Sequence, residues 1–139
     1  MKCLPSLFVT ASLLVAAPAF AHAEEALKAA PPGDPYVQVS DALPLPEFIP
    51  GLGTLFVDPN TLPAGPFLAY DHDGTLSATV YMTPFEDLQN GTAYDDLSVG
   101  SHTVSSVDIY YNAGHPGVEK PHAHVVLYHD ADAKGRLAE

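Results

Sequence analysis

Proline and glycine interrupt this chain so often that long helices have little room to form. Its 139 residues include 14 prolines and 10 glycines, which with clusters of Asn and Asp divide the chain after residue 35 into short apolar segments. Segments of about four to eight residues between turn residues are typical of β-strands. Six segments have this form: Tyr36–Ser40, Gly53–Val57, Pro66–Tyr70, Thr75–Met82, Thr103–Tyr111 and His122–His129.

The segment Thr75–Met82 has the clearest strand pattern. Its apolar residues alternate with polar ones, so that one face is apolar, as in a half-buried strand. The preceding Asp71–Gly74 ends in Asp-Gly, which predicts a hairpin turn. Asp71–Gly74 is also similar to the start of a calcium-binding loop, but the further oxygen ligands of such a loop are missing. We therefore interpret it as a turn.

One short helix is predicted after this strand. Thr83–Glu86 has the form of a capping box with proline at the first helical position, and Asn90–Gly91 is a typical helix end. No other segment shows a helical period. The predicted fold class is therefore mainly β, a small antiparallel sandwich or a partly open barrel with one short helix.

The first residues predict an export signal. Lys2 precedes the apolar stretch Leu7–Ala17, and small residues around Ala21 provide a cleavage site, so we expect a signal peptide over residues 1–23. A flexible leader (24–35), a single β domain (36–130) and a polar tail (131–139) should follow. The only cysteine, Cys3, falls in the signal peptide, so no disulfide is expected. The expected location is the periplasm or the exterior of the cell.

The charge of the chain excludes several partners. Seventeen acidic residues against five basic ones give a formal net charge of −12. Nucleic-acid binding requires the opposite charge and is excluded, and an anionic membrane surface is disfavoured. No other apolar run has membrane-spanning length, so no membrane insertion is expected after signal cleavage.

The feature that indicates chemistry is a histidine cluster near the C-terminus. His122 and His124 stand two residues apart in a predicted strand, so that both imidazoles lie on the same face. His115 lies in the loop that leads into this strand. Neutral imidazole is the commonest protein ligand for transition metals, and the ligand type favours zinc or copper. The three histidines are therefore a candidate site for a divalent transition metal.

Pairing of the last two predicted strands would supply further groups. A hairpin across residues 112–121 would place Asp108 on the same face as the histidines, as a fourth ligand or an acceptor that orients an imidazole. If the site were catalytic, Asp108 or Glu119 could act as the acid or base. His129 points to the other face. The opposite, apolar face of the hairpin is expected to form core, with the side chains of Val107, Ile109, Tyr111, Ala123, Val125 and Leu127.

Two family resemblances involve these residues. The first is to a family of exported bacterial proteins known only as a domain of unknown function, with members in Thermus. The segment Phe67–Asn90 resembles its strand and short helical segment, Gly114–Pro116 its Gly-His-Pro loop, and Pro121–His122 its Pro-His strand. The resemblance implies an exported, histidine-centred β domain without a defined reaction. His122–His124, with His129 in the place of a glutamate, is also similar to the first motif of cupins.

Two classes of function remain open. The first is an exported β domain that binds zinc or copper through His115, His122 and His124, with any reaction undefined. The second is a metal-free interaction module that binds an envelope protein, or a variant in which the histidines sense pH because imidazoles titrate near neutrality.

Overall fold

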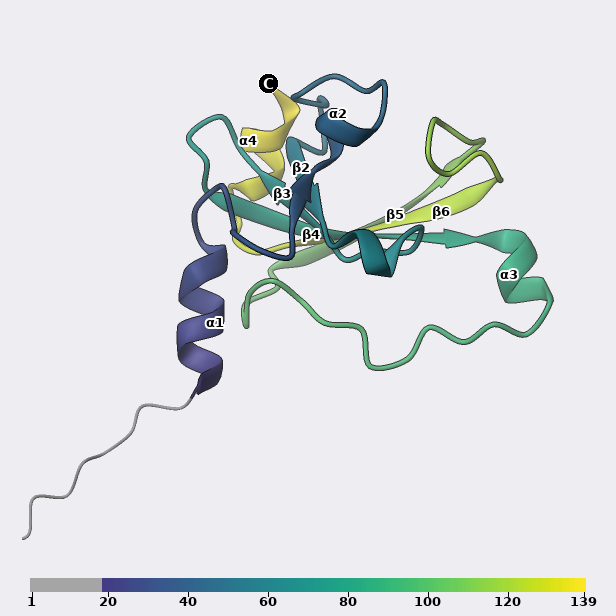
Figure 1. Ribbon diagram of the computed structural model, residues 1–139, viewed down its shortest axis with the longest axis horizontal. Helices are drawn as coiled ribbons and strands as arrows, with labels where there is room; N and C mark the ends of the chain where they lie inside the picture. The colour runs from purple at the N-terminus through teal and green to yellow at the C-terminus, as the bar shows by residue number, and fades with distance from the viewer. Residues whose placement is uncertain (1–18) are drawn as a thin grey trace, which may run out of the picture.

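A single antiparallel sheet of six strands forms the centre of the molecule (Figure 1). The computed structural model describes residues 19–139. The strand order is β1-β2-β3-β4-β6-β5, and the sheet is not closed into a barrel. The strands are β1 (Val37–Gln38), β2 (Thr54–Val57), β3 (Phe67–Tyr70), β4 (Leu76–Pro84), β5 (Ser106–Asn112) and β6 (His122–Tyr128). The mainly β, antiparallel class predicted from the sequence is confirmed.

The helices are more numerous than the single one predicted, and all of them are short. They are α1 (Ala19–Leu27), α2 (Val39–Ala42), the 3-10 turn η1 (Pro59–Thr61), α3 (Phe85–Gln89) and α4 (Ala133–Ala138). The predicted helix is α3, but Thr83 and Pro84 belong to the end of β4 because they pair with β6. The other helices have one to three turns, too few for a clear helical period in the sequence.

The long strand β4 lies between β3 and β6 and is buried on both faces. On one face, Ala78, Val80 and Met82 belong to the main core, which also contains residues of α2 and α4. Figure 1 shows α2, α4 and the β5–β6 hairpin loop on this same side of the sheet. On the other face, the Tyr81 hydroxyl donates to the Ser98 carbonyl and the Gly100 N–H donates to the Thr79 hydroxyl. These bonds attach the segment between α3 and β5 to the sheet.

The turn predicted at Asp71–Gly74 is present. Asp71 Oδ1 accepts hydrogen bonds from the N–H groups of Asp73 and Thr75, at 3.0 and 2.9 Å. Asp71 Oδ2 pairs with Arg136 of α4 at 2.7 Å. Burial alone would raise the pKa of Asp71, but the hydrogen bonds from Thr75 and Arg136 outweigh it and lower the pKa. Arg136 also pairs with Asp130, so this turn and the C-terminal helix are held together.

The expectation of a polar tail over residues 131–139 was wrong. This segment forms α4, and Ala133 and Leu137 are fully buried in the main core. The carbonyl of Leu137 accepts a hydrogen bond of 2.6 Å from the Gly51 N–H. Two buried residues in a segment rich in charge give too weak a pattern to predict a core helix, because so short a helix has few positions that face inward.

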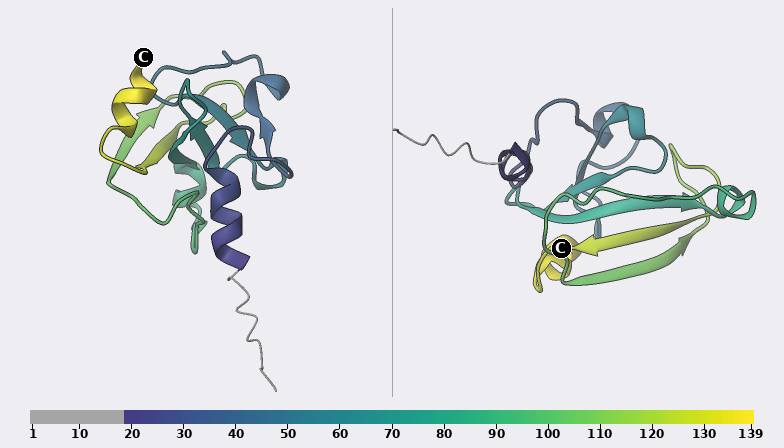
Figure 2. Two further views of the ribbon diagram at one scale, coloured as in Figure 1. Left: turned by 90° about the vertical axis from the view of Figure 1, so that its left-hand side faces the viewer. Right: turned by 90° about the horizontal axis from the view of Figure 1, so that it is seen from below.

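The expected core face of the β5–β6 hairpin was also wrong for its β5 residues, although Ala123 of β6 is buried. The two strands pair as predicted, as the right-hand view of Figure 2 shows. However, Val107, Ile109 and Tyr111 are 49%, 70% and 64% exposed, whereas His122 and His124 are buried. β6 is apolar on both faces. Val126 and Tyr128, which lie on the same face as the histidines, pair with residues of β4 and belong to the main core.

The N-terminal predictions concern residues that are described only in part. Of the predicted signal peptide (1–23), residues 1–18 lie outside the described part of the chain. The expected flexible leader begins within α1, and Ala29 forms an isolated β-bridge with Thr75. Within residues 19–139, no helix combines the length and the apolar character needed to cross a membrane.

Replacing Leu137 tests whether α4 is part of the core. Leu137→Ala should lower the free energy of unfolding by about 2–5 kcal/mol, because it leaves a cavity among fully buried side chains. Urea denaturation measures this change. Leu88→Ala is the matched control, since Leu88 is 45% exposed on α3 and its removal should change stability by less than about 0.5 kcal/mol. Equal effects of the two substitutions would contradict the packing of α4.

Candidate metal centre

His122 and His124 reach the site from β6, which has a neighbour on each side. His124 pairs with Met82 of β4 and Tyr110 of β5, and His122 occupies the next position on the same face. Side chains of directly paired residues share a face, so both imidazoles point to the core side of the sheet. The exposed fractions are 0% for His122 and 2% for His124. Strand pairing therefore places the two rings next to each other and away from solvent.

His115 reaches the same place from the hairpin loop. Its N–H and carbonyl groups both bond to Val118, at 3.0 Å each, and so form a tight turn. Gly114 has a φ of +127°, and a Cβ there would collide with the Glu119 carbonyl. Gly117 has a φ of +89°, and a Cβ there would lie 2.6 Å from a methyl group of Leu43. The two glycines allow the loop to close on itself and on the segment after α2, which fixes His115.

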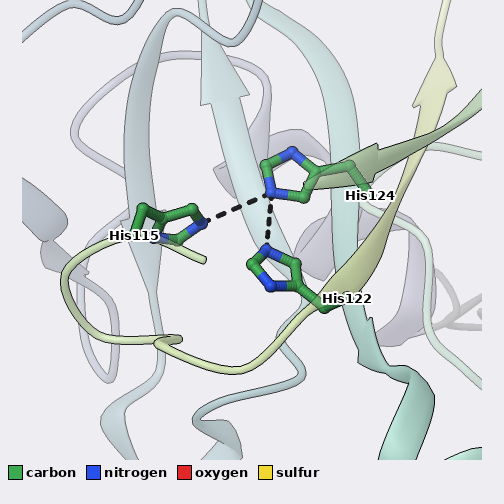
Figure 3. Close-up of side chains that lie close together, drawn as sticks. All are labelled: His115, His122 and His124. Atoms are coloured by element: carbon green, nitrogen blue, oxygen red, sulfur yellow. Dashed lines mark hydrogen bonds between the residues drawn. The ribbon is translucent and has the colours of Figure 1, made fainter. Parts of the chain in front are cut away.

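The Nε2 atoms of the three histidines converge (Figure 3). The distance between His122 Nε2 and His124 Nε2 is 2.9 Å, and that between His115 Nε2 and His124 Nε2 is 3.4 Å. One nitrogen from each ring lies within 4.8 Å of the other two. Imidazole nitrogens bound to one tetrahedral zinc at about 2.0–2.1 Å lie roughly 3.3 Å from each other. The spacing therefore fits a shared metal ion with small adjustments of the rings.

The other nitrogen of each ring is held by an oxygen atom. His122 Nδ1 lies 2.7 Å from the Lys120 carbonyl oxygen, and His115 Nδ1 lies 3.0 Å from the Pro116 carbonyl oxygen. A carbonyl only accepts, so in both rings Nδ1 carries the proton and the Nε2 of the neutral ring carries a lone pair. This hydrogen bond from the second ring nitrogen is characteristic of metal-bound histidine.

The third ring, His124, faces a group that can both donate and accept. Its Nδ1 lies 3.1 Å from the Tyr110 hydroxyl. Without a metal, the hydroxyl can donate to Nδ1, and Nε2–H can then donate to the lone pair of His122. With a metal at Nε2, the ring proton would be on Nδ1, and Nδ1–H would donate a hydrogen bond to the hydroxyl oxygen. Tyr110 thus supports both protonation patterns of His124.

Burial makes His124 a poor proton acceptor. It lowers the pKa of His124 to about 4, with a further contribution from the neighbouring His122 and His115. The ring is therefore neutral near pH 7 and available as a ligand. It is also neutral near pH 6, which argues against His124 as a sensor of mild acidity.

The structure does not bring Asp108 into the cluster. Its carboxylate pairs with Lys134 at 2.6 Å, and the hydrogen bond from Lys134 lowers the pKa of Asp108. Glu119 is exposed, and within the described residues only the three histidines form a group with metal-ligand spacing. His129 lies on the other face, as expected, with its ring nitrogens 2.9 Å from the Thr79 hydroxyl and 2.9 Å from the Thr103 carbonyl oxygen.

The predicted hairpin places Tyr110 on the same face as the histidines, but the sequence does not show which groups orient the rings. The position of Tyr110 opposite His124 follows from the hairpin register, which can be counted from the ends of the predicted strands. The roles of the Lys120 and Pro116 carbonyls depend on the backbone path of the loop, and residue types do not reveal it.

Metal-free protein should lose stability as the pH falls. The pKa of His124 is about 4 in the folded protein, against an ordinary histidine value of 6.5 in the unfolded chain, so the unfolded state binds more protons between these values. Stability present above pH 6.5 is therefore lost as the pH falls toward 4. We expect a loss of roughly 2 kcal/mol between pH 7 and pH 5 in urea denaturation of chelator-treated protein. His124→Gln should reduce this dependence, and the part that remains should come from buried His129, whose pKa is also lowered by burial. An unchanged dependence would contradict the assignment.

Comparison with solved structures identifies a relative of this chain. No model of a known protein family matches this chain, and no curated protein matches it. Among solved structures, the hypothetical protein TTHB210 from Thermus thermophilus is similar, with 41% sequence identity and a TM-score of 0.60. The similarity covers 68% of this chain and 94% of the Thermus chain. The resemblance to cupins does not extend to the fold, because the sheet is not closed into a barrel. The chain belongs to the same family as TTHB210 of Thermus thermophilus.

Proposed function

We propose that this protein binds one divalent transition metal ion, zinc or copper, through the Nε2 atoms of His115, His122 and His124. The observation that carries the proposal is the orientation of the three rings. Each Nδ1 faces an oxygen atom of the protein, and the three Nε2 atoms face one another. Buried histidines that serve only packing do not need this arrangement, as His129 shows, because both of its nitrogens face protein oxygens.

The ligand set favours zinc and copper over other ions. Imidazole suits both metals, whereas calcium and magnesium require oxygen ligands, and the described cluster contains no carboxylate. Three histidines leave a tetrahedral ion one further position for a water molecule or another ligand. Within the described residues no carboxylate joins the three histidines at ligand spacing, so we propose binding and not a specific reaction.

We also propose that the protein acts in the periplasm or outside the cell. The supporting feature is the sequence of its first residues, in which Lys2 precedes an apolar stretch and small residues suited to cleavage. The histidine site suits such a location because it contains no cysteine. Its metal affinity would therefore not depend on the redox state of a thiol.

The alternative function, a metal-free module that binds an envelope protein, is favoured by a different surface. β5 is an edge strand of the sheet, and its outer face exposes Val107, Ile109 and Tyr111. Exposed apolar edges are a common place for another chain to pair. The two functions are distinguished by metal content, because the alternative requires no ion at the histidines.

Metal analysis of purified protein tests the proposal. The chain should be expressed without a histidine tag, purified, and measured by elemental mass spectrometry. We expect close to one zinc or copper ion per chain. The variants His122→Ala and His124→Ala should lose the metal, because two nitrogen ligands bind a transition metal more weakly than three.

His102→Ala is the matched control for these variants. The His102 side chain is 79% exposed and lies outside the cluster, so its removal should leave the metal content unchanged. Parent protein that contains no metal and takes up neither added zinc nor added copper would refute the proposed site.

A further inference from the structure

An apolar cavity adjoins the histidine cluster. It has a volume of about 460 Å³ and lies between the sheet, the segment after α2 and the hairpin loop. This volume falls within the usual range of small-molecule sites. The walls include the apolar side chains of Val39, Leu43, Leu52, Leu55, Phe67 and Met82.

The polar side chains in the wall of the cavity lie close to one another. They belong to His115, His124 and Asn112, which all line the cavity. Among the described residues that line the cavity, none is an aspartate, glutamate, lysine or arginine. A molecule that fills the cavity therefore contacts mostly hydrocarbon side chains, and it contacts the histidine cluster where His115 and His124 line the wall.

We propose that this cavity binds an aliphatic monocarboxylate, with its chain among the apolar side chains and its carboxylate on the metal ion held by the histidines. The inference rests on the proposed metal site. Three neutral imidazoles leave the double positive charge of the ion uncompensated. An anionic oxygen ligand at the remaining position supplies part of the missing charge. An alcohol or an alkane of the same length would fill the cavity without supplying negative charge to the ion.

The hairpin loop forms the connection between the two parts of the site. His115 contributes to the metal cluster, and Val118 and Gly117 of the same tight turn contribute to the cavity wall. Gly117 lies against Leu43, a wall residue from the segment after α2. The metal ion and the hydrocarbon chain of the ligand should therefore both contact this loop.

A series of carboxylates of increasing length tests the proposal. Isothermal titration calorimetry of zinc-loaded protein should be carried out with acetate, butanoate, hexanoate, octanoate and decanoate. Affinity should rise by about fourfold for each methylene group until the chain fills the cavity. Decanol should bind at least about tenfold more weakly than decanoate, and chelator-treated protein should show the same loss.

Substitutions that fill the cavity provide the second part of the test. Leu45, a half-buried wall residue, and Leu62, a 48% exposed one, can be enlarged without replacing a fully buried side chain. Leu45→Phe and Leu62→Trp should lower decanoate affinity by about tenfold or more and leave the zinc content unchanged. Leu27→Phe is the matched control, because Leu27 is a half-buried leucine that packs against the separate apolar cluster around Tyr70.

The outcomes separate the two proposals. Protein that takes up no zinc by elemental analysis overturns both the metal site and the carboxylate site. Three results with protein that does take up zinc would overturn the carboxylate site alone. They are a carboxylate affinity that does not depend on chain length, equal binding of decanoate without zinc, and binding of decanoate by both cavity variants as tight as by the parent. Length dependence that requires zinc and is lost in the cavity variants supports the inference.

Discussion

The pairing of β6 with β4 on one side and β5 on the other is the interaction on which the site depends. It fixes which face of β6 carries His122 and His124, and it buries that face against the main core. A shift of one residue in this register would turn both rings to the opposite face. The same pairing brings Tyr110 opposite His124 and closes the hairpin whose loop carries His115.

Burial has a further consequence for the chemistry of the cluster. Protonation of a buried imidazole is costly, and His124 has two other imidazoles beside it, which together with burial lower its pKa to about 4. A lone pair that does not take up a proton remains available to a metal ion. The carbonyls of Lys120 and Pro116 make the arrangement directional, since they hold the protons of His122 and His115 on the side away from the cluster.

The local patterns of the sequence predicted the strands, the hairpin and the shared face of His122 and His124. They did not predict that this face would be the buried one. β6 has apolar residues on both faces, and the exposed Val107 and Ile109 of β5 made the other face look like core. The choice depends on α2, which is distant in the sequence, and on α4, which follows β6, and both helices are too short for a recognisable pattern. Asp108 shares the histidine face, as predicted, but its carboxylate pairs with Lys134 at the start of the unexpected helix α4 and not with the histidines.

X-ray absorption spectroscopy of the zinc-loaded protein tests the central claim most directly, because it reports the donor atoms around the ion in solution. Coordination by the three Nε2 atoms predicts a first shell with nitrogen at about 2.0–2.1 Å and the outer-shell scattering of three imidazole rings. A first shell of oxygen donors alone, or outer-shell scattering from a single imidazole, would contradict a metal centre formed by His115, His122 and His124.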